Sequence, residues 1–324
     1  VFPGVVFGNR TRHVKTVDAG VTFGELACQM PHEEKFRVLL VGAFRAFIPE
    51  AGAEKASQGG YVDVLGRSPY SLANGCLKAY AEADPDVRRG CHIEMLDLAE
   101  PLQLEDEREE FRFSEEDLQA ILDFEPDLVA FSSYCWNLDA VLAAAVELKA
   151  RRPSLEIVMG GRAVEGDSMT LLEEAPAIDA IVRGEGERAF RALLRHRGQN
   201  LGKMPGVLSR QGDEIRTVAA TSPLADLGEH PSPYISVVVD PPVGGAMLEL
   251  SRGCPNRCGY CTWSAERLSP LRFFPPERIE AEVRWLRERG HRLITLNDAA
   301  INYDTAHLAA AVDAINRADP DGEV

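Results

Sequence analysis

The sequence predicts an α/β fold in which a doubly wound domain with a parallel sheet is followed by the start of a second βα domain. Apolar, strand-like segments alternate with helical segments from residue 36 to residue 197, and this alternation is typical of a doubly wound parallel sheet. A proline-rich stretch over 219–245 ends the pattern, and a new strand begins at Ala246. A chain of 324 residues is also longer than one average domain, so two domains are expected.

Each strand of the first domain is expected from a short apolar run. The first run covers 36–42 and ends in glycine, as a buried parallel strand often does. Similar runs predict further strands over 92–98, 127–134, 156–160 and 178–184. Helices are expected between and after the strands, over 71–83, 114–124, 138–150, 168–174 and 187–197. The helix at Ser114 opens with an N-cap followed by acids, which suit the helix dipole.

The two ends of the first domain are less regular. Residues 1–35 show no clear periodicity and are interpreted as an N-terminal arm, with a small accessory element as the alternative. Residues 206–218 indicate a hairpin with Gln-Gly-Asp at its turn. We therefore place the first domain over 36–218 and a linker over 219–245.

The second domain is predicted over 246–324. A strand over 246–251 is followed by a helix over 275–290, which has proline at its start and glycine at its end. A second strand is expected over 293–298. A βα unit takes about 30 residues, so a barrel of six units needs about 180, whereas 79 residues run from Ala246 to Val324. We therefore expect a truncated barrel, with 322–324 as the start of its third strand.

The loops at the carboxyl ends of the parallel strands are the candidate ligand site of the first domain. They cover 42–47, 132–137, 160–163 and 184–187, and their glycines would let a bulky ligand approach the backbone closely. No G-x-G-x-x-G follows the first strand, and no P-loop lysine motif occurs. The sequence therefore disfavours a dinucleotide and a nucleoside triphosphate as ligands.

Three cysteines in one short run, Cys254, Cys258 and Cys261, have the spacing C-x3-C-x2-C. Three thiolates at this spacing can hold three irons of a [4Fe–4S] cluster and leave the fourth iron open for chemistry. Structural zinc is the alternative, but it needs a fourth ligand and usually two close pairs. A disulfide framework does not fit an odd count of seven cysteines in a long chain. The other cysteines are scattered singles: Cys28, Cys76, Cys91 and Cys135.

The cysteine run resembles the C-x3-C-x-aromatic-C signature of the radical S-adenosylmethionine (SAM) enzymes. This resemblance implies that the three cysteines are the cluster ligands, that Tyr260 lies near the adenine of SAM, and that Trp263 also contacts SAM. In many of these enzymes the second barrel strand ends in Gly-Gly-Glu, which binds the amino group of SAM. Here it ends in Asn-Asp-Ala-Ala. Asp298 is expected to accept a hydrogen bond from the same ammonium group. The alternative is that Asp298 is an ordinary turn residue.

The loops after the predicted strands resemble the cobalamin-binding domain that precedes many radical SAM barrels. The resemblance covers roughly 36–324 and includes the linker sequence from Pro223 to Tyr234. It implies that cobalamin is contacted by Phe44, Ser132, Ser133, Tyr134, Cys135, Trp136, Asn137, Gly160, Gly161, Arg162, Gly184, Glu185, Gly186 and Glu187.

One departure from other cobalamin proteins concerns the lower face of the cobalt. None of the seven histidines lies in a D-x-H-x-x-G motif, so no histidine ligand to cobalt is expected. The side chains expected to face the cobalt are Phe44, Tyr134, Cys135 and Trp136. Alternatively, the aromatic members of this set simply pack at strand ends. Cys135 is either a cobalt ligand or, as we favour, a buried inert thiol.

The resemblance implies a cobalamin-dependent radical SAM methyltransferase that acts on an unactivated carbon of a small molecule, in natural-product biosynthesis such as that of antibiotics. The reduced cluster would cleave SAM, and the resulting substrate radical would take a methyl group from methylcobalamin. An external electron donor of the flavodoxin or ferredoxin type is expected. One alternative keeps both cofactors but catalyses ring rearrangement, cyclisation or oxidation. Another is a non-catalytic cobalamin-binding sensor with a structural metal.

Composition restricts the partners and the location. The net charge of −16 opposes non-specific nucleic-acid binding, which needs a basic surface. No apolar run is long enough to span a bilayer, and no secretory signal is visible. We therefore expect a cytoplasmic protein without a membrane or nucleic-acid partner.

Overall fold

The computed structural model describes residues 35–47, 71–102, 113–212, 214–219, 223–236, 238–241, 246–256, 258, 261 and 270–322. These residues belong to one compact unit, Lys35–Val324. The N-terminal arm expected over 1–35 lies outside the described residues except for Lys35. In the described part, no helix has the length and apolar character needed to cross a membrane.

A seven-stranded sheet forms the first part of the fold, with the order β2-β1-β3-β4-β5-β6-β7. The first five strands in this order are parallel and the last two are antiparallel. This arrangement confirms the predicted doubly wound α/β class and the predicted hairpin. The strands are β1 (Phe36–Phe47), β2 (Cys91–Leu102), β3 (Leu128–Ser132), β4 (Glu156–Gly160), β5 (Ala180–Val182), β6 (Val207–Gln211) and β7 (Glu214–Thr217).

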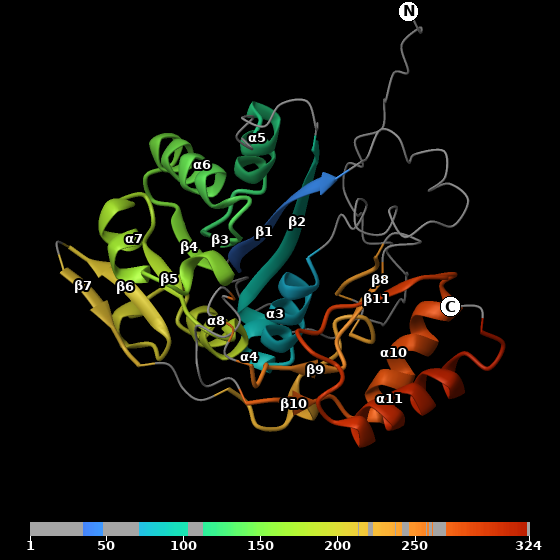
Figure 1. Ribbon diagram of the computed structural model, residues 1–324. Coiled ribbons are helices and arrows are strands. Elements are labelled where there is room, and N and C mark those ends of the chain that lie inside the picture. The colour runs from blue at the N-terminus through green and yellow to red at the C-terminus, as the bar shows by residue number, and fades with distance from the viewer. Residues whose placement is uncertain are drawn as a thin grey trace, which may run out of the picture. The chain divides into compact units, whose positions relative to one another are not determined.

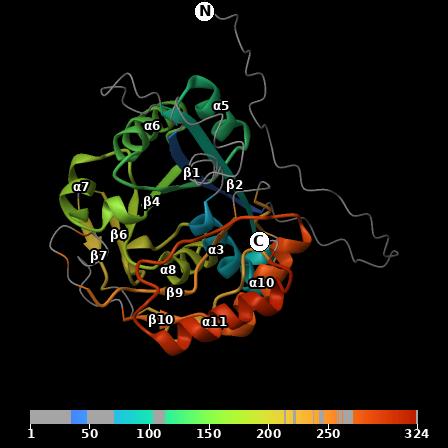
Figure 2. The same cartoon turned by 45° about the vertical axis from the view of Figure 1, so that its right-hand side comes forward.

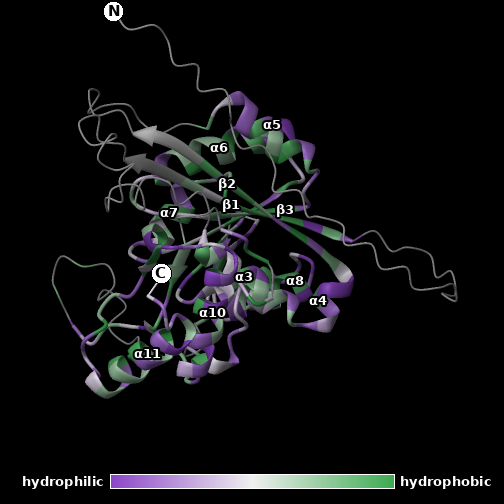
Figure 3. Ribbon diagram, turned by 90° about the vertical axis from the view of Figure 1, so that its right-hand side faces the viewer, coloured by the Kyte–Doolittle hydropathy of each residue, from purple (hydrophilic) through white to green (hydrophobic). Residues whose placement is uncertain are grey.

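The sheet is covered on both faces because its central strands alternate between two apolar cores. In β1, Leu39 and Val41 pack in one core, and Val38 and Leu40 pack in the other. Figures 1 and 2 show the two helix layers, and Figure 3 shows hydrophobic strands between helices with polar outer surfaces. The first core is covered by α5 (Glu115–Asp123), α6 (Leu138–Arg151) and α7 (Ser168–Glu174), and the second by α3 (Leu72–Glu82), α4 (Pro85–Gly90) and α8 (Gly186–Arg195).

Local signals explain most of the helix boundaries. Ser114 and Asp117 form a capping box at the start of α5, as the sequence predicts. The short helix α4 was not predicted. It begins after Asp84, whose carboxylate caps the first turn, and it has Pro85 at its first position. The described residues of this part also include the short 3₁₀ helices η1 (Arg162–Val164) and η2 (Leu201–Lys203), while η3 (Leu227–Glu229) lies in the linker and places Leu227 in the core of the second part.

The second part of the fold contains two small sheets. In one, β8 (Ala246–Leu248) pairs in parallel with β11 (Ile294–Leu296). In the other, β9 (Ser251–Arg252) pairs antiparallel with β10 (Arg272–Phe273). The single strand predicted over 246–251 is therefore wrong, because the chain leaves the first sheet after Leu248 and starts another at Ser251.

Two helices pack against these strands. The predicted helix is present as α10 (Pro276–Glu288), and α11 (Thr305–Ala318) was not predicted. Their apolar faces meet in a separate core with β8, which includes Leu248, Ile279 and Ala311. Gly322 is not in a strand, and 323–324 lie outside the described residues, so the start of a third strand is not seen.

Candidate functional site

Three of the predicted loops, those after β3, β4 and β5, lie at the carboxyl ends of parallel strands and so at one edge of the main sheet. The fourth loop, expected over 42–47, is wrong, because these residues continue β1 as far as Phe47. The loops after β3 and β4 are joined by two backbone hydrogen bonds. The amide of Ser133 donates to the carbonyl of Gly160 at 2.7 Å, and the amide of Ala163 donates to the carbonyl of Ser133 at 3.0 Å. Gly161 has φ +101°, and a Cβ there would lie 2.6 Å from the Ser133 carbonyl oxygen. This contact therefore requires glycine.

Asn137 holds this edge together rather than pointing out of it. Its side chain is buried and donates to the carbonyls of Ala43 at 2.9 Å and Ser132 at 3.1 Å. Its amide oxygen accepts from the backbone N–H of Tyr134 at 2.7 Å. Asn137 thus links β1 to the end of β3, which the sequence alone does not show. A direct contact of Asn137 with cobalamin stays a prediction.

The segment between β3 and α6 presents aromatic surface. The rings of Tyr134 and Trp136 stack at 4.6 Å between centroids with an interplanar angle of 4°. Trp136 is 48% exposed, so simple packing in the core does not account for it. Burial raises the pKa of Tyr134, which keeps its hydroxyl protonated. Cys135 is exposed, so the expectation that it is a buried thiol is wrong.

Of two other predicted cobalamin contacts, Ser133 and Phe44, the structure describes the side chain of Ser133 only. Ser133 is fully buried, and its hydroxyl has no hydrogen-bond partner among the described residues, which is unusual for a buried polar group. Phe44 lies in β1, but its side chain is not among those described. A ligand with polar groups at this edge would satisfy the Ser133 hydroxyl.

The loop after β5 is joined to the segment that carries the cysteines. Glu187 lies in the first turn of α8, and its Oε1 accepts from Nη1 of Arg252 at 2.5 Å. Glu185 accepts from Nη1 of Arg272 at 3.0 Å. Burial alone would raise the pKa of Glu187, but Arg252 and then His230 hold it below its ordinary value. The predicted role of both glutamates as cobalamin contacts is not tested, and their carboxylates are ion-paired.

The three cysteines lie in the segment between β9 and β10, and Cys254 follows Arg252 after a single glycine with φ +96°. All three are partly exposed. Among the described side chains, no group of three or more His, Cys, Asp or Glu is arranged to hold a metal ion. The donor chemistry of the three thiols fits an iron–sulfur cluster. Tyr260 and Trp263 lie outside the described residues.

Asp298 secures the strand from which the cysteine segment departs. It follows β11, and its Oδ1 accepts from the amide of Ser251 and from the Ser251 hydroxyl, both at 2.6 Å. Its Oδ2 accepts from the amide of Leu250 at 3.0 Å. These bonds join β11 to the turn between β8 and β9. Binding of the SAM amino group by Asp298 stays a prediction.

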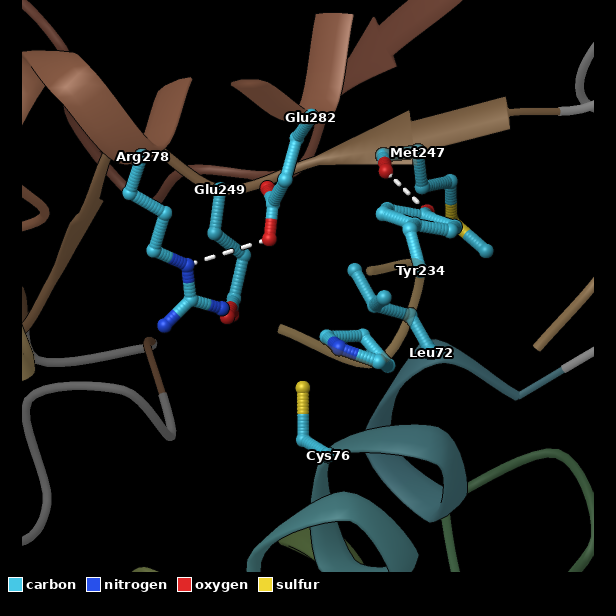
Figure 4. Close-up of a pocket in the computed structure, with 8 residues that line it drawn as sticks. Leu72, Cys76, Tyr234, Met247, Glu249, Arg278 and Glu282 are labelled. Atoms are coloured by element: carbon cyan, nitrogen blue, oxygen red, sulfur yellow. Dashed lines mark hydrogen bonds and ion pairs between the residues drawn. The ribbon is translucent and has the colours of Figure 1, made fainter. Parts of the chain in front are cut away.

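A small cavity of about 210 Å³, including its open mouth, lies between α3 and the second part of the fold. Figure 4 shows Cys76 on α3 below Glu249, Arg278 and Glu282. Burial raises the pKa of Cys76 to about 12, so this thiol is protonated and unreactive near neutral pH. The cavity is lined by Leu72, Cys76, Pro233, Tyr234, Met247, Glu249, Arg278 and Glu282.

Sequence reasoning missed the charged side chains that join the two parts of the fold. Arg252 bonds Glu249 at 2.9 Å in addition to Glu187, and desolvation raises the pKa of Glu249. His230 is buried, and its Nδ1 lies 3.7 Å from Oε1 of Glu187. Burial lowers the pKa of His230. No local motif marks these residues, because their partners lie far away in the sequence.

Comparison with known proteins identifies part of this architecture. Residues 87–194 match the family described as B12 binding domain. The chain is 34% identical over 240 residues to a 2-(S-pantetheinyl)-carbapenam-3-carboxylate methyltransferase of Streptantibioticus cattleyicolor, covering 70% of this chain and 33% of that protein. It is 33% identical over 250 residues to the cobalamin-dependent radical SAM methyltransferase TokK of Streptomyces tokunonensis, covering 72% and 34%. The chain thus spans about a third of the length of these curated relatives.

The fold is also similar to that of a solved structure. The radical SAM methyltransferase TsrM of Kitasatospora setae, with tryptophan and a SAM analogue bound, matches with a TM-score of 0.60 and 15% identity. The match covers 89% of this chain and 53% of that one. At this identity the likeness concerns the fold.

Proposed function

The chain carries a B12-binding domain and is related to cobalamin-dependent radical SAM methyltransferases, and from this relationship we propose that it methylates an unactivated carbon of a small molecule. One observation carries the proposal. The arginine before the cysteine segment is ion-paired to the loop after β5 of the B12-binding domain. The two segments that would hold the two cofactors are therefore in direct contact.

The residues proposed to hold the cofactors fit their chemistry. Cys254, Cys258 and Cys261 would ligate the [4Fe–4S] cluster, and Tyr260 and Trp263 would contact SAM. Cobalamin would lie over the end of β1 and the loops after β3, β4 and β5, where the Ser133 hydroxyl, which has no partner among the described residues, supplies a polar contact. When bound, the cluster and SAM supply a radical that abstracts hydrogen, and cobalamin supplies the methyl group.

The protein's own side chains would orient these groups. The stacked Tyr134 and Trp136 offer a flat aromatic surface toward a macrocycle. Asn137 and Gly161 keep the loops beside it in one conformation. Asp298 would fix the strand before the cysteines and, as we propose, would also accept from the SAM ammonium. In this scheme 36–218 is the cobalamin domain, 219–245 the linker, and 246–324 part of a radical SAM barrel.

The substrate and partners follow from the same relationship. The carbapenam and TokK relatives are both methyltransferases, which favours methyl transfer over rearrangement or a sensor role. A natural-product intermediate is the proposed substrate class, with a flavodoxin or ferredoxin as electron donor. An oxygen-sensitive cluster suits a reducing cytoplasm.

Anaerobic reconstitution tests the proposal. The purified chain is given iron, sulfide and cobalamin, and then labelled SAM with a reductant. We expect iron and sulfide to be incorporated, the visible spectrum of bound cobalamin to appear, and 5′-deoxyadenosine to form. The triple variant Cys254→Ala, Cys258→Ala and Cys261→Ala should keep cobalamin but lose the iron. Zinc in place of iron, with no cleavage of SAM, would instead support the sensor role.

A further inference from the structure

Two arginines face each other at the base of the cysteine segment. Arg252 in β9 and Arg272 in β10 are directly paired in the antiparallel ladder, so their side chains lie on the same face. Like charges in such a position repel each other and destabilise the pair of strands. The cysteine segment, 253–271, begins and ends at this pair. A compensating negative charge is therefore needed to close its base.

The N-terminus of α8 supplies that charge, in addition to Glu249, which binds Arg252 at 2.9 Å. Glu187 binds Arg252 with 2.5 Å between Oε1 and Nη1, and Glu185 binds Arg272 with 3.0 Å between Oε2 and Nη1. Acidic residues are also favourable in this position because the helix dipole is positive at its N-terminus. Figures 1 and 2 both show β9 and β10 beside α8. We refer to Arg252, Arg272, Glu185 and Glu187 as the clamp.

The clamp is shielded from water. The side chains of Arg252, Glu187 and Arg272 are 13%, 7% and 5% exposed, and that of Glu185 is 24% exposed. Removal of one partner from a buried ion pair is strongly destabilising, because the other charge is left buried and uncompensated. A buried pair also has few alternative geometries that satisfy both charges. The clamp therefore restricts β9 and β10 to one placement on α8.

We propose that the clamp is the device that fixes the cysteine segment against the edge of the cobalamin sheet. Its four side chains are positioning residues, which set the separation between the two cofactors by holding β9 and β10 on α8. This inference rests on the proposed function for the nature of the cofactors. The clamp places the cysteine segment in the cofactor-free protein as well.

Hydrogen exchange in the cofactor-free protein tests the placement. Glu185→Gln and Glu187→Gln each remove one charge with little change in shape. We expect amides of β9, β10 and the cysteine segment to exchange about tenfold faster or more, as loss of a buried pair predicts. Exchange in β1 and β3 should not change. Glu115→Gln, which breaks the exposed pair with Arg151, is the matched control. Unchanged exchange in β9 and β10 of both clamp variants would overturn the inference.

A second measurement separates positioning from stability. In the protein loaded with both cofactors, a reduced cluster near cob(II)alamin should shorten the electron-spin relaxation of the cobalt. We expect Arg272→Met, which removes the clamp partner of Glu185 and lies outside the predicted cobalamin contacts, to bind as much iron and cobalamin as the wild type but to show altered relaxation. Arg272→Lys should restore part of the wild-type behaviour relative to Arg272→Met, since it keeps the charge.

The two proposals fail in different ways. A wild-type chain that takes up neither iron nor cobalamin contradicts the proposed function, while the exchange experiment still decides on the clamp. A wild-type chain that loads both cofactors, together with variants whose relaxation is the same as the wild type, overturns the clamp as a positioning device and leaves the proposed function standing.

Discussion

Glu187 and Arg252 are separated by 65 residues in the sequence, yet their Oε1 and Nη1 atoms lie 2.5 Å apart. Both side chains are nearly inaccessible to solvent. Arg252 also binds Glu249 at 2.9 Å, so one guanidinium compensates two carboxylates. This contact joins the helix that follows β5 to the strand that precedes the cysteines.

Replacement of Arg252 by alanine should leave both carboxylates buried without their cation. We expect Arg252→Ala to lower the free energy of unfolding by about 3–5 kcal/mol, as is usual when one partner of a buried pair is removed. Urea denaturation monitored by circular dichroism measures the loss of free energy of unfolding. The control Arg151→Ala breaks an exposed pair with Glu115 and should cost less than about 1 kcal/mol. Equal losses in the two variants would argue against a buried network.

Asp97 should make the protein less stable as the pH rises. Burial raises its pKa to about 7, although the amide of Ser71 donates to it at 2.9 Å. The ordinary pKa of Asp is about 3.9, so between these values the folded chain holds a proton that the unfolded chain has released. The stabilising contribution is complete below about pH 4 and is lost as the pH rises through about 7.

Asp97→Asn should remove this dependence, because the amide oxygen still accepts from Ser71 and carries no charge. We expect the variant to be more stable than the wild type at pH 8, by at most about 4 kcal/mol, and equally stable near pH 4. Urea unfolding at both pH values checks this. The exposed Asp86 provides the control Asp86→Asn. A variant that loses stability with rising pH as steeply as the wild type would refute the assignment.

Gly161 should not tolerate a side chain. Its φ is +101°, and a Cβ would lie 2.6 Å from the Ser133 carbonyl oxygen. We expect Gly161→Ala to lower the free energy of unfolding by about 1–3 kcal/mol and to weaken cobalamin binding, measured by visible absorbance. Gly166→Ala is the matched control, because its Cβ would meet nothing within 4 Å. The prediction fails if the two variants bind cobalamin equally well.

Trp136 should matter for cobalamin binding but not for folding. Its side chain is 48% exposed and contacts Tyr134 by stacking, so Trp136→Ala should change stability by no more than about 0.5 kcal/mol. Loss of an aromatic contact to the corrin should weaken binding about threefold to tenfold. Titration with cobalamin measures it, and Val146→Ala at an exposed position of α6 serves as control. Unaltered affinity would remove Trp136 from the site.

The main sheet was predicted well from the sequence because parallel strands that are buried on both faces consist of consecutive apolar residues. Val38 and Leu40 face one core while Leu39 and Val41 face the other, so both faces of β1 are apolar and the run is unmistakable. The break between β8 and β9 was missed because it lies inside a segment that reads as one strand. The bend depends on Asp298, which lies 47 residues beyond Ser251 in the chain.

The candidate site was predicted only in part. Parallel strands bring the loops after β3 and β4 together, and this follows from the fold class alone. The separate tasks of those loop residues do not follow from it. Asn137 turned out to bond two carbonyls of the scaffold, and Cys135 turned out to be exposed. Glu185 and Glu187 read as loop residues, because their arginine partners come from a segment that is distant in the sequence.

The pairing of Arg252 with Arg272 limits how such proteins can be recombined. A chimera joined within 219–245 would bring a foreign cysteine segment, with its own residues at the base, onto the α8 of this chain. Two glutamates would then meet whatever side chains the new segment carries, and a mismatch would leave buried charge. A functional exchange must therefore transfer the first turn of α8 together with the cysteine segment, although more than 60 residues separate the two in the chain.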